Sequence, residues 1–164
     1  MPELDWQNWI ALWLFAPLFA ATAWTDFTQL RIPNTYCIIG LVIFVATAPF
    51  LEWHELFMRL MIGGACFLLC FGLFAVRWLG GGDAKMLPVV FLIVPSPAVP
   101  DYLLLLAAGM GLGLVGMALV RRYAKTLSPR FKSTAQSREF PMGIAIGSSG
   151  LVLTLHSVLQ LTPN

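Results

Sequence analysis

The sequence predicts an all-α membrane protein, a bundle of six transmembrane helices that forms a single domain over residues 1–164. Hydrophobic residues make up 59% of the chain and charged residues only 11%, whereas about 25% of an average soluble domain is charged. A soluble domain of about this size buries only ~70% of its unfolded surface, too little for so much apolar area. A lipid bilayer removes this difficulty because the bilayer is itself an apolar solvent.

Six apolar stretches approach or reach the ~20 residues that a transmembrane helix needs. They cover approximately residues 8–25, 35–51, 56–76, 86–100, 102–120 and 142–161. The fourth is short and contains Pro88, Pro95 and Pro97, which predicts a broken or partly re-entrant helix. The leading charges are Glu3 and Asp5 rather than a basic segment, so we expect the first apolar stretch to be a retained helix and not a cleaved signal.

The basic residues divide the predicted loops into two groups. With six spans, the first, third and fifth loops share one face, and nine of the ten basic residues fall in them: Arg31, Arg77, Lys85, Arg121, Arg122, Lys125, Arg130, Lys132 and Arg138. The other face holds Arg59 and five acidic residues of the external tails and loops: Glu3, Asp5, Glu52, Glu55 and Asp101. Because cytoplasmic loops carry the excess of Lys and Arg, both termini are predicted outside and the three basic loops inside. We expect the fifth loop, residues 121–141, to contact lipid headgroups rather than a protein partner.

Small residues inside the spans are predicted to pack helices together. In lipid, glycine allows close backbone approach between helices. The glycines concentrate in the third, fifth and last spans: Gly63, Gly64, Gly109, Gly111, Gly113, Gly116, Gly143, Gly147 and Gly150. The three cysteines, Cys37, Cys66 and Cys70, also lie in apolar stretches, where we expect packing and neither a metal site nor a disulfide.

Two acidic residues remain once those of the external tails and loops, and Glu139 in the basic fifth loop, are set aside. Asp26 follows the first span, and Asp83 closes a run of three glycines, Gly80, Gly81 and Gly82, just before the fourth span. By the predicted orientation both lie at the cytoplasmic interface. Glycine is used where the backbone adopts φ > 0 or where another chain approaches closely, so a glycine run that carries a carboxylate indicates a substrate cleft. A carboxylate this close to hydrocarbon indicates a functional site.

Two carboxylates in one partly desolvated site are suited to general acid–base catalysis. Like charges in contact do not both ionise easily, so the pair shares one proton. One carboxylate then activates a water molecule, while the other protonates or polarises the scissile carbonyl group. Asp83 lies near a helix N-terminus, whose dipole favours the anion, and Asp26 near a C-terminus, whose dipole disfavours it. Our hypothesis is that Asp83 is the more acidic residue and that Asp26 holds the proton.

These residues resemble the two signatures of the type IV prepilin peptidases, relatives of the Gly-x-Gly-Asp membrane aspartic proteases. Asp26 with Ile32, Pro33 and Asn34 resembles the family's Asp-x5-Ile-Pro-Asn element. The three glycines with Asp83 and Lys85 resemble its Gly-x-Gly-Asp-x-Lys element. The segment from Pro141 to Ile146 resembles the Pro-x-Gly-x-Ala sequence that opens the last helix in many members. Both signatures occur in order, and the resemblance extends over residues ~24 to ~150.

The resemblance implies an aspartic endopeptidase of the bacterial inner membrane. The enzyme would remove the basic leader of pilin-like precursors at the cytoplasmic face, after a glycine that precedes the precursor's apolar segment. Asp26 and Asp83 correspond to the catalytic pair. Ile32, Pro33, Asn34, the glycine run and Lys85 correspond to motif residues that shape the cleft. We expect the bilayer and a precursor protein as partners, no nucleic acid, no metal and no cofactor; the oligomeric state is not predicted.

The chain also departs from the larger members of the family. These carry an insertion with paired cysteines near the N-terminus, associated with methylation of the new pilin terminus. Only 25 residues precede Asp26 here, without such an insertion. The chain therefore looks like the short form found with tight-adherence (Flp) pilus systems, and methylation is not expected.

Three other functions fit the same carboxylates. A small proton-coupled transporter also places acids near helix breaks, but here both acids map to one interface and there is no internal repeat. An assembly factor that kept the fold and lost activity would not need the intact pair. A related Gly-x-Gly-Asp membrane protease with another substrate, such as a preflagellin or a signal peptide, stays open.

Overall fold

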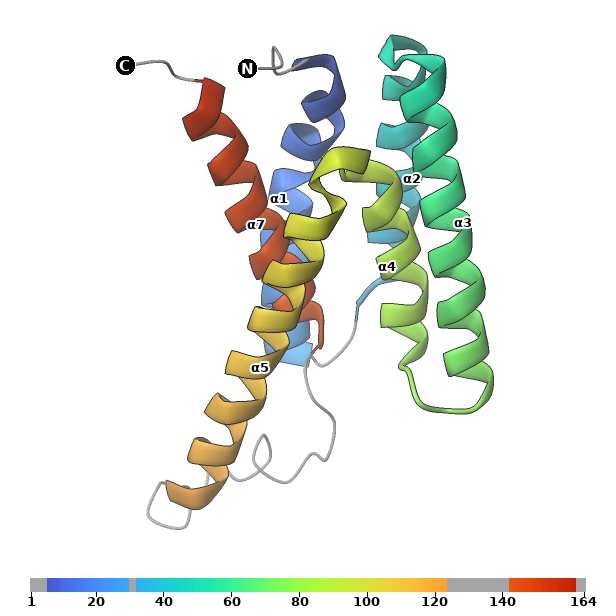
Figure 1. Cartoon of the computed structure of the whole chain (residues 1–164). Coiled ribbons are helices and arrows are strands. Elements are labelled where there is room, and N and C mark those ends of the chain that lie inside the picture. The colour runs from blue at the N-terminus through green and yellow to red at the C-terminus, as the bar shows by residue number, and fades with distance from the viewer. Residues whose placement is uncertain (1–5, 30–31, 124–141, 162–164) are drawn as a thin grey trace.

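The computed structural model describes residues 6–29, 32–123 and 142–161. All regular structure in these residues is helical, which confirms the predicted all-α fold for this part of the chain. The α-helices are α1 (Trp6–Gln29), α2 (Asn34–Thr47), α3 (Trp53–Ala75), α4 (Gly81–Ile93), α5 (Val99–Tyr123) and α7 (Met142–Leu161). Two short 3₁₀ helices, η1 (Ala48–Phe50) and η2 (Ser96–Ala98), follow α2 and precede α5. Successive α-helices run in alternate directions along the bundle (Figure 1).

Within the described residues, four helical segments are long and apolar enough to cross a membrane. They are α1, α3, residues Ser96–Gly116 of η2 and α5, and residues Met142–Gln160 of α7. The helical stretch Asn34–Phe50 is apolar but shorter. With 13 residues, α4 is only about 20 Å long, whereas the hydrocarbon core is about 30 Å thick. The chain is therefore a multi-pass membrane protein, while the six-span count and the orientation stay predictions.

The first span ends later than predicted. Helix α1 continues to Gln29, so Asp26 lies inside its last turn and not in a loop after it. The Thr25 and Thr28 hydroxyl groups donate to the carbonyl oxygens of Ala21 and Trp24, at 2.9 and 2.8 Å. Because these side chains satisfy their polarity within the helix, the polar sequence does not end it.

The boundaries predicted for the fourth span, 86–100, are wrong at both ends. Helix α4 begins at Gly81, inside the glycine run. Glycine can occupy this first turn, where the N–H groups have no partner within the helix. The helix ends at Ile93, since Val94 precedes Pro95 and takes an extended conformation with ψ 130°. Asp83 therefore lies in the first turn of α4 and not before the helix. The predicted break near the prolines is the turn between α4 and α5.

Glycine allows α7 to pack closely on α1. A Cβ atom at Gly147 would collide with the backbone oxygen of Phe19, and one at Gly150 would collide with the Phe19 ring. On α3, a Cβ atom at Gly63 would lie 2.6 Å from Leu92 of α4. The packing role is confirmed at these positions. It is wrong for Gly64, Gly111 and Gly116, where a Cβ atom would meet nothing within 4 Å.

The sequence prediction that places Glu55 in an external loop is also wrong. Helix α3 begins at Trp53, and Glu55 is buried in its first turn. It forms an ion pair of 2.8 Å with Arg59 one turn later, and Arg59 is fully buried. The partner was missed because the predicted span began after Glu55, which left the acid outside the helix that positions it.

The close contact between α7 and α1 can be tested with two alanine substitutions. Gly147→Ala places a methyl group against backbone that cannot rotate away, and we expect a loss of about 1–3 kcal/mol, as for overpacked cores. Gly111→Ala is the matched control, because its methyl group enters open space. Thermal unfolding in detergent, followed by circular dichroism, compares the two proteins. Equal stability of the two variants would contradict the predicted contact.

Candidate active site

Three helix termini meet at one end of the bundle. The C-terminal end of α1 and the N-terminal ends of α4 and α7 lie at the same end (Figure 1). Asp26 is in the last turn of α1, and Asp83 is in the first turn of α4. The two acids that the sequence singled out therefore come from helices that end together.

Asp26 is enclosed by the first turn of α7. Its exposed fraction is 6%, and its Oδ2 atom is buried without a hydrogen-bond partner among the described residues. A Cβ atom at Gly143 would lie only 2.7 Å from Asp26 Cβ, so glycine is required for this approach. The backbone N–H groups of Gly143 and Ile144 face the carboxyl group. A buried carboxyl oxygen without a protein partner is rare and indicates a functional group.

Asp83 lies within electrostatic range of Asp26. Burial, and secondly the charge of Asp26, raise the pKa of Asp83 from 3.8 to about 6. Like charges raise a carboxyl pKa in this way only when they are close and poorly solvated. The two groups can therefore titrate as a unit that holds one proton near neutral pH.

The glycine run before Asp83 serves close approach and not a left-handed backbone. None of the described glycines has a positive φ, and Gly81 and Gly82 are helical. A Cβ atom at Gly82 would lie 3.3 Å from Ile32 Cβ, and one at Gly80 would lie 2.9 Å from Asp83 Oδ2. Of the two expectations for this run, the close contact holds and the unusual backbone conformation does not.

The two sequence motifs also meet through their polar residues. Lys85 Nζ donates a hydrogen bond of 3.3 Å to Asn34 Oδ1, which links α4 to the start of α2. Pro33 caps α2 in an extended conformation, and Ile32 packs against Gly82. Leu30 and Arg31, which complete the first motif, lie outside the described residues. The structure thus brings the described members of both motifs to one end of the bundle.

The proton assignment predicted from helix dipoles stays a prediction. That prediction considered α1 and α4 only. The N-terminus of α7 also faces Asp26, and its free N–H groups favour an anion there. Burial and the unpartnered Oδ2 atom disfavour the same anion. Asp83 in turn has a pKa raised to about 6, first by burial and then by the charge of Asp26. Which of the two carboxyl groups holds the proton is therefore decided by titration of both.

Sequence reasoning assigned Gly143 to helix packing and gave Ile144 no role. The available signal was Pro141 and Gly143 at the opening of the last span, since proline favours helix starts and glycine admits a close neighbour. The contribution of Ile144 is a backbone N–H group, which no side-chain pattern reveals.

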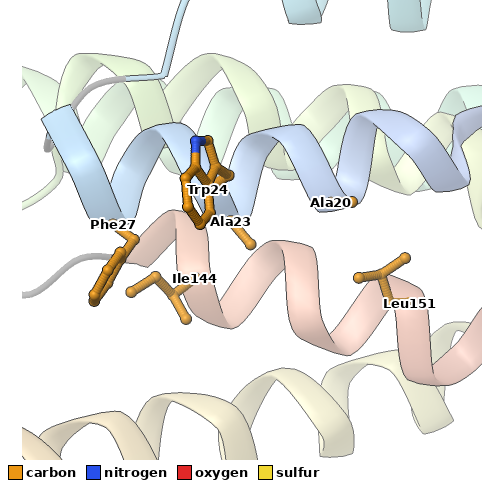
Figure 2. Close-up of a pocket in the computed structure, with 6 residues that line it drawn as sticks. All are labelled: Ala20, Ala23, Trp24, Phe27, Ile144 and Leu151. Atoms are coloured by element: carbon orange, nitrogen blue, oxygen red, sulfur yellow. The ribbon is translucent and has the colours of Figure 1, made fainter.

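An apolar groove runs along the outer face of the seam between α1 and α7. Figure 2 shows Trp24, Phe27 and Ile144 close together at one end of it, nearest to the start of α7. Ala20, Ala23 and Leu151 complete the lining. With no carboxylate, hydroxyl or imidazole in the lining, the groove has no group for acid–base chemistry.

No metal-binding cluster is found within residues 6–29, 32–123 and 142–161. No group of three or more His, Cys, Asp or Glu side chains there is arranged to hold an ion. The thiol groups of Cys66 and Cys70 lie on one face of α3, with their sulfur atoms 3.8 Å apart.

Electrostatic coupling between the carboxyl groups can be measured directly. Replacing Asp26 by Asn removes a negative charge, so we expect the pKa of Asp83 to fall from about 6 toward its ordinary value. Carbon-13 NMR titration of the carboxyl groups measures the shift. Asp101→Asn is the control, because Asp101 is an exposed acid at the start of α5 and should leave the pKa of Asp83 unchanged. An unchanged pKa in Asp26→Asn would show that the two groups do not interact.

The sequence was compared with known proteins. A family model described as the type IV leader peptidase family matches residues 13–118, well over half of the chain. The matched region contains Asp26, Asp83 and the motif residues around them, and it ends before α7. No curated protein and no solved structure matches the chain.

Proposed function

The chain belongs to the type IV leader peptidase family, and from this premise we propose that it is a membrane aspartic endopeptidase whose catalytic pair is Asp26 and Asp83. The observation that carries the proposal is the meeting of the two acids at one end of the bundle, where Asp26 has a buried, unpartnered oxygen and where burial and the charge of Asp26 raise the pKa of Asp83 to about 6. Two carboxyl groups that share a proton are the chemical requirement of aspartic proteolysis. Membership of a peptidase family supports the reaction class but leaves the catalytic residues to be tested.

The proposed reaction uses the two carboxyl groups in different protonation states. Asp26, as the anion, removes a proton from a water molecule that attacks the carbonyl carbon of the scissile peptide bond. Asp83, as the acid, donates its proton to the carbonyl oxygen, which takes up negative charge during the attack. Collapse of the tetrahedral intermediate passes a proton to the leaving nitrogen, and the pair returns to its singly protonated state.

The proposed substrate is the precursor of a pilin-like protein. A family of leader peptidases implies such precursors in general. We further propose the Flp type of precursor, cleavage after a glycine, and a position in the bacterial inner membrane with the carboxylates at the cytoplasmic face. The supports are the predicted distribution of basic loops and the resemblance to the short family form, since residues 1–34 contain no cysteine. Methylation of the product is not proposed.

Asn34 and Lys85 are proposed to shape the cleft rather than to react. Both side chains are exposed and hydrogen-bonded to one another at the end of the bundle where the carboxylates lie. An amide and an ammonium group there can hold the backbone of a bound peptide by hydrogen bonds. Cleavage of a preflagellin or another leader in preference to a pilin precursor would redirect the substrate assignment without changing this chemistry.

The proposed activity is tested by cleavage of a pilin precursor in proteoliposomes. The precursor carries a basic leader and a glycine before its apolar helix. We expect Asp26→Asn and Asp83→Asn each to lower kcat by at least about 10³-fold, since each removes an acid–base group that acts in the transition state. Asp101→Asn should cut at the wild-type rate. Full activity in either variant of the pair would exclude that residue as catalytic.

The contact between α7 and Asp26 gives a second test of the same site. Gly143→Ala inserts a methyl group 2.7 Å from Asp26 Cβ, so the carboxyl group or the α7 backbone must move. Because misplacement by about 1 Å costs up to ~10²-fold in rate, we expect a loss of kcat of at least about ten-fold. Gly116→Ala is the control, since its Cβ atom meets nothing within 4 Å. Unchanged kcat in Gly143→Ala would show that the contact of α7 with Asp26 does not affect the reaction.

A further inference from the structure

A buried ion pair lies at the end of the bundle opposite to the carboxylates. Arg59 is fully buried, and its Nε atom lies 2.8 Å from Glu55 Oε1 on the same helix, α3. The family motifs and the proposed reaction use neither residue. Charged side chains inside membrane segments are costly and are found mainly where they serve a function.

The guanidinium group of Arg59 also bridges two other helices. Its Nη2 atom donates to the Asn8 carbonyl oxygen of α1 at 2.6 Å. Its Nη1 atom donates to the Ile93 carbonyl oxygen, at the C-terminal end of α4, at 3.0 Å. Glu55 in turn accepts hydrogen bonds from the Ser96 backbone N–H, at 2.8 Å, and from the Ser96 hydroxyl group. One planar side chain thus joins α1, α3 and α4.

The two bridged helices are those that carry the carboxylates. With a rise of about 1.5 Å per residue, Asn8 is about 27 Å from Asp26 along α1, and Ile93 is about 15 Å from Asp83 along α4. Elsewhere α1 packs mainly on α7, and α4 packs mainly on α3. A sliding movement of α1 along α4 would change the separation of the carboxylates. The Arg59 bridge opposes this movement because both carbonyl groups are bonded to one rigid fork.

We propose that Arg59 is a positioning residue of the peptidase, which fixes the axial register of α1 and α4 and thereby the separation of Asp26 and Asp83. The inference rests on the proposed function, because it gives the bridge a role in that reaction.

Stability alone is a poor explanation for this ion pair. Desolvation of two charges offsets most of their attraction, and apolar residues of similar volume are often as stable or more stable. An apolar side chain would pack between the helices but would leave them free to slide. Directional bonds to one carbonyl group on each helix define a single register, which apolar contact does not.

The test compares two substitutions that keep the buried charges balanced. Arg59→Lys retains the cation beside Glu55, but a compact ammonium group cannot also reach carbonyl groups on both α1 and α4. The double variant Glu55→Gln/Arg59→Gln removes both charges and so leaves no unpaired ion. Cys70→Ala is the matched control, since it trims a buried side chain of the same helix whose sulfur atom lies 3.8 Å from that of Cys66.

Two readouts separate positioning from folding. The first is kcat and KM for the pilin precursor as a function of pH. We expect kcat to fall by at least about ten-fold in the folded Arg59 variants, with KM within about two-fold of wild type. The pH profile should also become narrower, because carboxylates that move apart share their proton less strongly. A merely structural role would lower activity by one factor at every pH.

The second readout needs no substrate. It is the change in the pKa of Asp83 on Asp26→Asn, measured by NMR in the wild-type background and in each Arg59 background. The charged group that acts on Asp83 from α1 is Asp26, while Lys85, two residues later on α4, is bonded to Asn34 of α2. A smaller change in the pKa of Asp83 in the Arg59 variants than in Cys70→Ala supports the proposed role of Arg59 in the axial register. An equal change, or wild-type kcat and pH profile in a folded Arg59 variant, overturns it.

The two proposals fail in different ways. If the wild type cuts no precursor but the Arg59 variants still weaken the electrostatic coupling of Asp26 and Asp83, the proposed function fails. The proposed role of Arg59 in the axial register is then still supported. If the wild type cuts and the Arg59 variants keep both the rate and the coupling, the register fails and the proposed function stands.

Discussion

The close contact of α7 with α1 is the interaction on which the site depends. Lipid offers no hydrophobic drive for helix association, so packing and hydrogen bonds between helices must provide it. Gly147 and Gly150 let α7 approach the Phe19 region of α1, and Trp13 Nε1 donates a 3.0 Å hydrogen bond to the Ser157 hydroxyl group farther along the seam. The same approach ends at Gly143, where the first backbone N–H groups of α7 reach Asp26. Packing of the last helix and the environment of the first carboxylate are therefore one structural feature.

The buried charged groups of the described bundle lie near its two ends. At one end the carboxylates of α1 and α4 interact, and at the other Arg59 joins the same two helices. Between them the core is apolar, with Phe15, Phe19 and Val90 buried. An apolar core of this kind resists compression but does not by itself fix how far one helix stands along another. Directional hydrogen bonds at the ends define the axial position of the helices, which the apolar middle does not.

The sequence predicted the all-α fold and singled out Asp26 and Asp83. It predicted the groups that surround these two acids less well. The last span was predicted at residues 142–161, where α7 is found, because apolar residues there are continuous and flanked by polar segments. The end of α1 was missed because Thr25 and Thr28 look polar in sequence but bond to their own helix. The start of α4 was missed because a glycine run resembles a loop, although glycine is tolerated in a first helical turn.

The groups around the carboxylates were harder to predict because they depend on contacts between distant segments. The backbone N–H groups of Gly143 and Ile144 come near Asp26 only when α7 packs on α1. They act against the effect of burial on Asp26, so helix dipoles alone do not determine which carboxyl group holds the proton. Glu55 was assigned to a loop because the predicted third span, 56–76, began one residue after it, although its partner Arg59 lies one turn later on the same helix. Net loop charge predicts orientation but does not distinguish a solvated residue from a buried one.

The shortness of α4 has a consequence for the access of water. A helix of 13 residues is about 10 Å shorter than the hydrocarbon layer, and most of its side chains are buried among the neighbouring helices. The length that α4 does not span is therefore bordered by protein rather than by lipid. A helix end at membrane depth is tolerated where it lies inside the protein or beside water. Water that enters beside the first turn of α4 would supply the hydrolysis proposed there.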